Sequence, residues 1–326
     1  MSDFQPVVDF LGRHDRIIIT THETPDGDAI GSECAMARAL VQLGRTVLVL
    51  NADPTPRKFR FVDVDGIVQV LEHPGQLPDD LERWALLMLD TSDVRNIGQV
   101  AGLVLPHVRE HFIIDHHENE GDLLAGNFVQ KSASSTAEIL HPLFAALGVE
   151  IDYPIALALY TGIVYDTGSF IYPKTTALTF GIARDLVERG VAPNVVYARM
   201  YESNSVPALV LHSRVLATLE LALGDHVAVL VMRREMIAES GATYEDADPF
   251  INIPLRSEDI RVSVFFKENL EGLMRCSMRS KGAIDVVEIA ERFGGGGHRT
   301  AAGFKCREPL EETRQSVLSM LAKYFA

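Results

Sequence analysis

Three residues whose side chains bind metal ions stand next to one another at Asp115, His116 and His117. They follow the apolar run Phe112–Ile114, which has the composition of a buried strand. A carboxylate and two imidazoles at the end of a strand are suited to hold a divalent cation. The triplet therefore predicts metal chemistry at a strand end.

Further acidic positions have the same placement, because each follows an apolar run that we expect to be a strand. Ligands of an open α/β sheet gather at the carboxyl ends of its strands, so we expect one shared site. Carboxylates mixed with imidazoles suit Mn²⁺ or Mg²⁺ better than a thiolate-type zinc site, and two ions could clamp the attacking and leaving oxygens of a phosphoryl displacement. The positions are His22, Asp26 and Asp28 after residues 16–21, Asp90 after residues 84–89, and Asp166 after residues 159–165.

Each of these aspartates also has a plainer interpretation. Asp28 stands at the expected start of a helix, where a carboxylate can simply cap free N–H groups. An aspartate after a strand, such as Asp90 or Asp93, is often only a turn former, and this is the interpretation we favour for Asp93. Asp166 closes an apolar stretch and would be costly to bury without a cation or another partner. Taken together, the positions favour a metal site.

A glycine-rich segment, residues 294–303, is the second feature that indicates chemistry. Four consecutive glycines precede His298 and would let backbone N–H groups approach an anion closely. A flexible turn is the alternative for the glycines, and a solvated strand residue is the alternative for Arg279. We favour a phosphate or nucleotide site that includes Arg279, Gly296, Gly297 and His298; Arg299 is less well supported, because the residue after a ligand often points away.

The positions of apolar runs predict the elements that hold these residues. Apolar or β-branched runs predict strands, and a helix over 28–43 ends at Gly44. Strand–helix alternation predicts an N-terminal, mostly parallel sheet with helices on both faces, a helical connector and a smaller C-terminal α/β domain. We expect Ser132–Thr136 to cap the helix that follows. The expected strands are 16–21, 46–50, 84–89, 111–114, 227–231, 261–266 and 273–279, and the expected domains are 1–193, 194–222 (linker) and 223–326.

The bulk composition restricts the classes of function. The chain has 326 residues and a net charge of −15, which disfavours a protein that grips long duplex nucleic acid through a basic surface. A short anionic ligand held with the help of metal ions remains compatible with that charge. No apolar run approaches the roughly 20 residues of a membrane helix, and we see no secretory signal. Three isolated cysteines fit reduced thiols, so we expect a cytoplasmic protein without membrane contact.

The chain resembles the DHH phosphoesterases over nearly its whole length, in the four acidic motifs and in the segment from Arg279 to Gly303. The family includes inorganic pyrophosphatases and exonucleases, and the C-terminal segment resembles the form found in NrnA-type enzymes. The resemblance implies two divalent ions, Mn²⁺ preferred and Mg²⁺ as an alternative, with Asp90 bridging them. It implies His22, Asp26 and Asp90 on the first ion, Asp28, Asp90, His116 and Asp166 on the second, Asp115 orienting an imidazole, His117 facing the phosphate, and Arg279, Gly296, Gly297 and His298 on the terminal nucleotide.

The same resemblance implies hydrolysis of short oligoribonucleotides and of linear dinucleotides such as pApA or pGpG to 5′-mononucleotides. It also implies hydrolysis of 3′-phosphoadenosine 5′-phosphate to AMP, and it is consistent with a homodimer. An inorganic pyrophosphatase is one alternative, although those enzymes have a C-terminal domain without the glycine loop. A nucleotide-sensing module without turnover is another, but a pure sensor has no need of two carboxylate-bridged ions.

Overall fold

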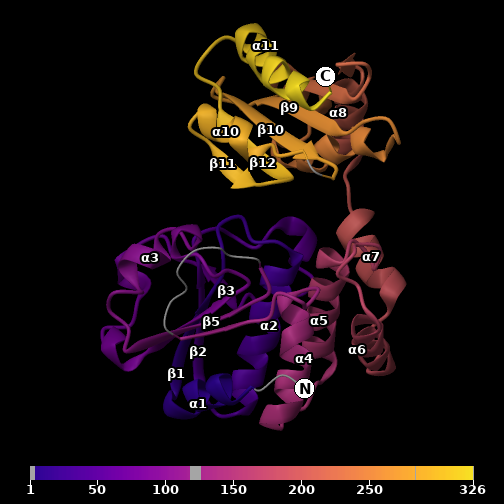
Figure 1. Cartoon of the computed structure of the whole chain (residues 1–326). Coiled ribbons are helices and arrows are strands. Elements are labelled where there is room, and N and C mark those ends of the chain that lie inside the picture. The colour runs from indigo at the N-terminus through magenta and orange to yellow at the C-terminus, as the bar shows by residue number, and fades with distance from the viewer. Residues whose placement is uncertain (1–3, 118–125, 283, 326) are drawn as a thin grey trace. The chain divides into compact units, whose positions relative to one another are not determined.

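The computed structural model describes residues 4–117, 126–282 and 284–325 and divides into two compact units, 1–203 and 204–326 (Figure 1). The division falls inside the segment 194–222, between the helices α7 and α8. No helix among the described residues is both long enough and apolar enough to cross a membrane. In chain order, the helices are α1 Gln5–Arg13, α2 Gly27–Gln42, α3 Val100–Leu103, α4 Thr136–Leu147, α5 Tyr153–Asp166, α6 Ala177–Glu188, α7 Pro193–Tyr201, α8 Val206–Leu216, α9 Arg234–Ser240, α10 Val287–Arg292 and α11 Leu310–Leu321.

The N-terminal unit is built on a six-stranded, fully parallel sheet in the order β3-β2-β1-β4-β5-β6. Parallel strands of this kind are buried on both faces, which explains their continuous apolar sequences. The mostly parallel sheet expected from the sequence is therefore confirmed. The strands are β1 Arg16–Thr20, β2 Thr46–Asn51, β3 Val68–Val70, β4 Ala85–Leu89, β5 Glu110–Asp115 and β6 Asn127–Val129.

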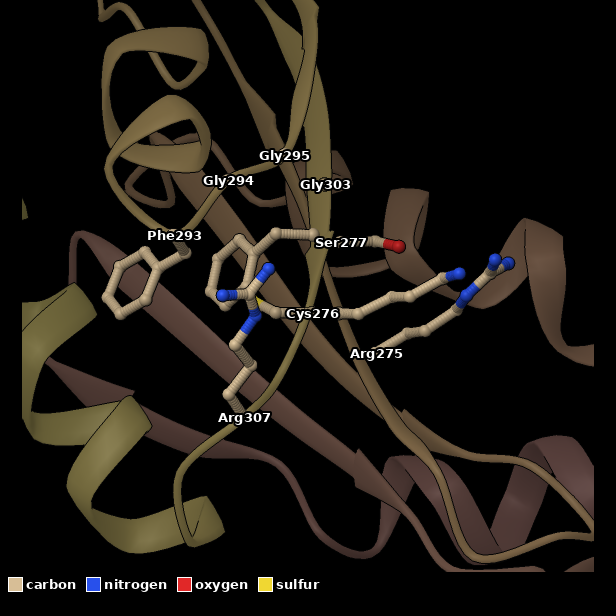
Figure 2. Close-up of a pocket in the computed structure, with 10 residues that line it drawn as sticks. Arg275, Cys276, Ser277, Phe293, Gly294, Gly295, Gly303 and Arg307 are labelled. Carbon is tan, nitrogen blue, oxygen red and sulfur yellow. The ribbon is translucent and has the colours of Figure 1, made fainter.

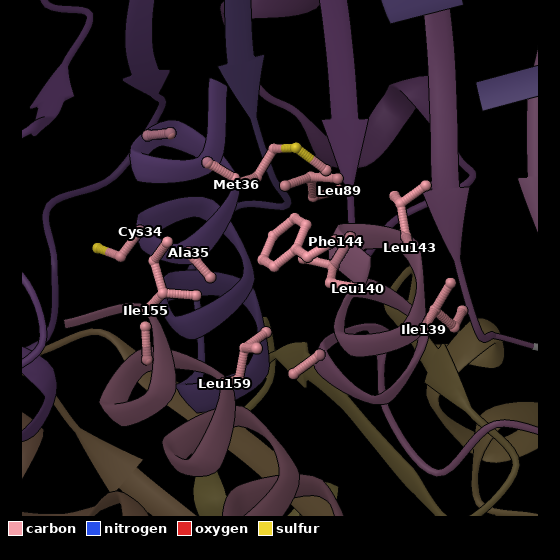
Figure 3. Close-up of a cluster of buried hydrophobic side chains, with 14 of the residues drawn as sticks. Cys34, Ala35, Met36, Leu89, Ile139, Leu140, Leu143, Phe144, Ile155 and Leu159 are labelled. Atoms are coloured by element: carbon pink, nitrogen blue, oxygen red, sulfur yellow. The ribbon is translucent and has the colours of Figure 1, made fainter. Parts of the chain in front are cut away.

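Alternate residues of each strand enter two separate cores. On β1, Ile17 and Ile19 face one core with α1, α2, α4, α5 and α6, whereas Ile18 faces another with α3. Figure 3 shows how side chains of α2, α4 and α5 meet β4 in the larger core, with Met36, Phe144 and Leu89 close together. Helices thus cover both faces of the sheet and fix the strand ends in place.

One sequence expectation about this unit is wrong, and one alternative that the sequence left open, capping by Asp28, is excluded. Residues 159–165 form part of helix α5 rather than a strand. The sequence suggested a strand because α5 is buried on nearly all sides, so its apolar residues show no helical periodicity. The residue that caps α2 is Asp26, whose Oδ1 accepts hydrogen bonds from Asp28 N and Ala29 N, and not Asp28. Ser135 caps α4 as expected, through its hydroxyl and Glu138 N.

The C-terminal unit has a mixed six-stranded sheet in the order β11-β12-β10-β9-β8-β7. Only β8 and β9 run parallel among its described strands; the other neighbours are antiparallel. Helices α10 and α11 cover one face, and α8 and α9 cover β8 and β9 on the other. The strands are β7 Glu220–Ala222, β8 Val227–Met232, β9 Val262–Glu268, β10 Met274–Ser280, β11 Gly296–His298 and β12 Ala301–Lys305.

Candidate metal centre and substrate residues

Three neighbouring strands of the N-terminal sheet end in the predicted metal ligands. His22 comes two residues after β1, Asp90 follows β4 directly, and His116 follows Asp115, the last residue of β5. The chain runs from β1 outward to β2 and β3 and returns to β4 on the other side of β1, so the strand order reverses between β1 and β4. Such a reversal leaves a crevice at the carboxyl ends of the strands, where ligands of α/β sheets bind.

The turn between β1 and α2 supplies the first group of side chains. His22 Nδ1 lies 2.8 Å from the carbonyl oxygen of Glu23, so the ring is held through Nδ1 while Nε2 lies 3.8 Å from Asp90 Oδ2. Ligating histidines in proteins are commonly held in this way through their second nitrogen. Asp26, the cap of α2, lies beside His22 and Asp90. The cap and the candidate ligand are therefore the same carboxylate.

Asp28 lies in the first turn of α2 and is completely buried. Its two oxygens accept hydrogen bonds from the backbone of another helix: Oδ2 from Thr136 N at 2.6 Å and Oδ1 from Ala137 N at 3.0 Å. The hydroxyl of Ser32 donates to Oδ1 as well. The free N–H groups at the start of α4 thus fix the position of Asp28.

Asp90 is 2% exposed and lies at the centre of the site. Its φ of 59° is in the left-handed region, which aspartate tolerates better than most residues, and such strain is concentrated at functional sites. The Thr136 hydroxyl donates to Asp90 Oδ1 at 2.9 Å. Thr136 therefore contacts both Asp28 and Asp90. The sequence indicated a helix cap at Ser132–Thr136, and the family resemblance implied a place near the active cleft, but neither revealed these contacts.

His116 and Asp166 complete the group. The Nδ1 atom of His116 lies 3.4 Å from the carbonyl oxygen of Ala133, and its buried Nε2 lies 2.9 Å from Asp166 Oδ2 without meeting hydrogen-bond geometry. The same Nε2 is 3.5 Å from Asp90 Oδ1. Asp166 reaches this position from the C-terminal end of α5 and not from a strand.

The structure brings all six predicted ligands together. Three sets of ligand atoms each lie within 4.8 Å of one another, and Asp90 belongs to two of them. The third member of one set is His117, which the resemblance places on the substrate instead. The sets are His22, Asp26 and Asp90; Asp28, His116 and Asp166; and Asp90, His116 and His117.

The electrostatics of this cluster fit divalent cations. Burial and the charge of Asp166 raise the pKa of Asp28 to about 7, and the same two causes raise the pKa of Asp26. Burial, with the charges of Asp28 and Asp26, raises the pKa of Asp90 well above its usual range. Burial alone would lower the pKa of His116, but Asp166 and Asp28 raise it to about 9. Buried carboxylates and imidazoles that retain protons in this way can exchange them for a metal ion.

Asp115 holds the neighbouring imidazole of His117. Its Oδ1 lies 2.7 Å from His117 Nδ1 and also accepts from the backbone N–H groups of His116 and His117. These hydrogen bonds outweigh burial and lower the pKa of Asp115, so it carries its charge. Asp115 is fully buried, whereas the side chain of His117 is 43% exposed. An oriented, partly exposed imidazole is suited to meet a ligand.

The predicted substrate residues lie in the C-terminal unit, on β10 and β11. Arg279 is opposite Ala301 of β12, and its Nη1 donates to the Met278 carbonyl oxygen. Gly296 and Gly297 belong to β11 rather than to a flexible loop, which departs from the turn interpretation. The φ of Gly297 is +141°, and a Cβ there would lie 2.4 Å from the carbonyl oxygen of Ala301, so only glycine fits. His298 ends the strand.

The sequence matches two family models. Residues 16–163 match the DHH family, N-terminal domain, and residues 224–326 match the DHHA1 domain. The candidate ligand Asp166 lies just beyond the first match. All of the candidate residues from β10 and β11 lie inside the second.

Curated relatives and a solved structure match most of the chain. The chain is 33% identical over 287 residues to the bifunctional oligoribonuclease and PAP phosphatase NrnA of Thermus thermophilus, covering 88% of this chain and 83% of that one. It is 27% identical to the protein of the same name from Bacillus subtilis, covering 90% of each chain. The crystal structure of an exopolyphosphatase-related protein from Bacteroides fragilis superposes with a TM-score of 0.92 at 25% identity, covering 99% of this chain and 96% of that one.

Proposed function

The chain belongs to the DHH family, and on that basis we propose that it is a metal-dependent phosphoesterase acting on short oligoribonucleotides. The observation that carries this proposal is the convergence of two histidines and four aspartates, mostly from the carboxyl ends of three strands, around Asp90. The relatives from Thermus thermophilus and Bacillus subtilis are each named bifunctional oligoribonuclease and PAP phosphatase NrnA. The intact ligand set favours turnover over simple nucleotide sensing.

Two divalent ions, with Mn²⁺ preferred over Mg²⁺, fit this set of donors. We assign His22, Asp26 and Asp90 to one ion and Asp28, Asp90, His116 and Asp166 to the other. Such ions supply positive charge to a phosphoryl group and lower the pKa of water. The protein's part is to hold the carboxylates still: the α4 N-terminus fixes Asp28, and the Thr136 hydroxyl fixes Asp90.

His117 is the residue we assign to the scissile phosphate. With Nδ1 held by the charged Asp115, its imidazole keeps one orientation. A protonated imidazole near the phosphate can neutralise developing charge and give its proton to the leaving oxygen. Asp115 thus acts as a positioning residue for His117.

The C-terminal unit supplies the residues that we assign to the terminal nucleotide. Arg279 provides a guanidinium, and the backbone at Gly296 and Gly297 permits close approach of a phosphate, followed by His298. We propose pApA, pGpG and RNA of a few nucleotides as substrates yielding 5′-mononucleotides, and 3′-phosphoadenosine 5′-phosphate as a substrate yielding AMP. A net charge of −15 makes long duplex nucleic acid a poor ligand.

One side-by-side assay tests the proposal. Purified protein is incubated with pApA, a five-nucleotide RNA, 3′-phosphoadenosine 5′-phosphate or pyrophosphate, each with Mn²⁺ and with Mg²⁺, and the products are separated by ion-exchange chromatography. We expect mononucleotides from the first three substrates and faster turnover with Mn²⁺. Hydrolysis of pyrophosphate alone would identify a pyrophosphatase, and tight binding of pApA without turnover would identify a sensor; either result rejects the proposal.

A further inference from the structure

A row of three cations crosses the sheet of the C-terminal unit. The strand register places Lys267 of β9 opposite Arg275 of β10, and Arg275 opposite Lys305 of β12. Residues directly opposite on antiparallel strands share one face of the sheet, and like charges in such positions destabilise the pairing. Negatively charged groups from other parts of the protein, or from a ligand, would therefore stabilise this row of cations.

The protein neutralises only one end of the row. Lys267 is 8% exposed and forms an ion pair with Asp248. Arg275 and Lys305 are exposed, and neither forms an ion pair with a carboxylate in the described part of the chain. Glu308 lines an adjoining pocket with Lys305, but no ion pair joins them within the described residues. Two adjacent cations are thus left to solvent or to a ligand.

A pocket of about 570 Å³ lies against these two cations (Figure 2). Its lining includes Arg275, Lys305 and Arg307 and, among the described residues, no carboxylate. The chain as a whole has 45 acidic against 30 basic residues, so a pocket whose charged lining residues are all cations differs from the average composition of the chain. In Figure 2, Arg275 and Ser277 extend to one side of the strand, while Arg307 and Phe293 lie on the other. The local charge suits an anion.

The face that carries Arg275 continues to the candidate nucleotide site. Along β10, Ser277 and Arg279 follow on the same face, because Cys276 and Met278 between them are buried in the core. Opposite them on β12 stand Gly303 and Ala301, so no large side chain of β12 lies beside this part of β10. Four residues of strand separate the Cα atoms of Arg279 and Arg275 by roughly 14 Å, so a phosphate bound directly over Arg279 leaves the position at Arg275 open to another phosphate.

We propose that Arg275 and Lys305 form a second phosphate subsite, which binds an internal phosphodiester of oligoribonucleotides longer than two nucleotides. The proposal rests on the proposed function, because it places the terminal phosphate at Arg279. The subsite gives the enzyme additional affinity for RNA of about three to five nucleotides and none for a dinucleotide, which cannot reach it.

The test compares two ligand lengths in one double variant. Fluorescence anisotropy measures the binding of labelled pApA and of a labelled five-nucleotide RNA to the full chain without added metal. In R275A/K305A we expect the affinity for the five-nucleotide RNA to fall about tenfold, while that for pApA stays within about twofold. The slope of log affinity against log salt should become shallower by about 0.7 for the longer RNA only. The variant R275K/K305R should restore binding.

A control with the same change of charge is available in the same unit. Arg214 and Lys323 each form an ion pair, with Glu239 and Glu288, so R214A/K323A also removes two cations. Removing the unpaired, mutually repelling Arg275 and Lys305 should leave the melting temperature unchanged or raise it, which checks folding. Equal weakening for both lengths, no weakening, or the same effect in R214A/K323A overturns the subsite. Length-dependent binding without hydrolysis would reject the proposed function and leave the subsite standing.

Discussion

Gly162 links the packing of the N-terminal unit to the metal centre. It lies on α5, and a Cβ there would be 2.6 Å from Asp28 Oδ1 and 2.8 Å from Ala137 Cβ. Both distances are far inside van der Waals contact, so Gly162→Ala must displace Asp28 or separate α5 from α4. Overpacking of this kind costs about 1–3 kcal/mol, and the better helix propensity of alanine returns about 0.5–1 kcal/mol. We expect a net loss of about 1–2 kcal/mol in the free energy of unfolding.

The displaced atom is also a candidate metal ligand, so activity should change with stability. Disturbing the support of a ligand typically lowers metal affinity by about 10–100-fold, and we expect the Mn²⁺ concentration for half-maximal hydrolysis to rise by that factor. Urea unfolding in EDTA measures the stability. Trp84, the single tryptophan, is 5% exposed and lies in the N-terminal unit, so its fluorescence reports on that unit alone.

Gly181 on α6 provides the matched control, since a Cβ there would meet no atom within 4 Å. Gly181→Ala should stabilise the protein by about 0.5–1 kcal/mol through helix propensity and leave the Mn²⁺ requirement unchanged. If Gly162→Ala is as stable as Gly181→Ala, or needs no more Mn²⁺ than the wild type, the proposed coupling between α5 packing and Asp28 is refuted.

Three other predictions concern the N-terminal unit, two of them the metal centre and one the buried Glu33 of α2. Mn²⁺ at about 100 times its Kd should stabilise the N-terminal unit by about 2.7 kcal/mol, measured by urea unfolding with Trp84 fluorescence. An unfolding midpoint that does not change with the Mn²⁺ concentration would argue against a metal centre. Burial raises the pKa of Glu33 to about 8, so the unfolded chain loses this proton at a lower pH than the folded protein does. The stability of the wild type relative to Glu33→Gln should therefore fall as the pH rises from about 4.5 to about 8, and a difference in stability that does not depend on pH would contradict this. Thr136→Val removes the hydroxyl that donates to Asp90 and should slow hydrolysis roughly tenfold, whereas Thr136→Ser should retain it; equal rates would exclude the role.

The sequence was sufficient for the elements whose burial has a simple pattern. Parallel strands buried on both faces read as unbroken apolar runs, which is why β1, β4 and β5 and the residues after them could be located. The same rule failed at residues 159–165, because a helix buried among other helices also reads as an unbroken run. Asp166 lies beside Asp28 and His116, but it belongs to a helix and not to the strand that we expected.

Other features depend on contacts between distant parts of the chain. Thr136 meets Asp28 across 108 residues of sequence, so no local pattern could show that the start of α4 holds a candidate ligand. Arg275 and Lys305 become neighbours only through the register of β10 and β12. Asp26 and not Asp28 caps α2, because the helix begins at Gly27, one residue earlier than expected.

The most direct test of the metal-dependent mechanism is the release of AMP from pApA by metal-stripped protein, before and after addition of Mn²⁺, in the wild type and in Asp90→Asn. Asparagine tolerates the φ of 59° at this position and removes only the charge. We predict no release without metal, rapid release by the wild type with Mn²⁺, and a rate at least about a hundredfold lower in Asp90→Asn. Undiminished release by Asp90→Asn, or release by the metal-stripped wild type, would contradict the mechanism.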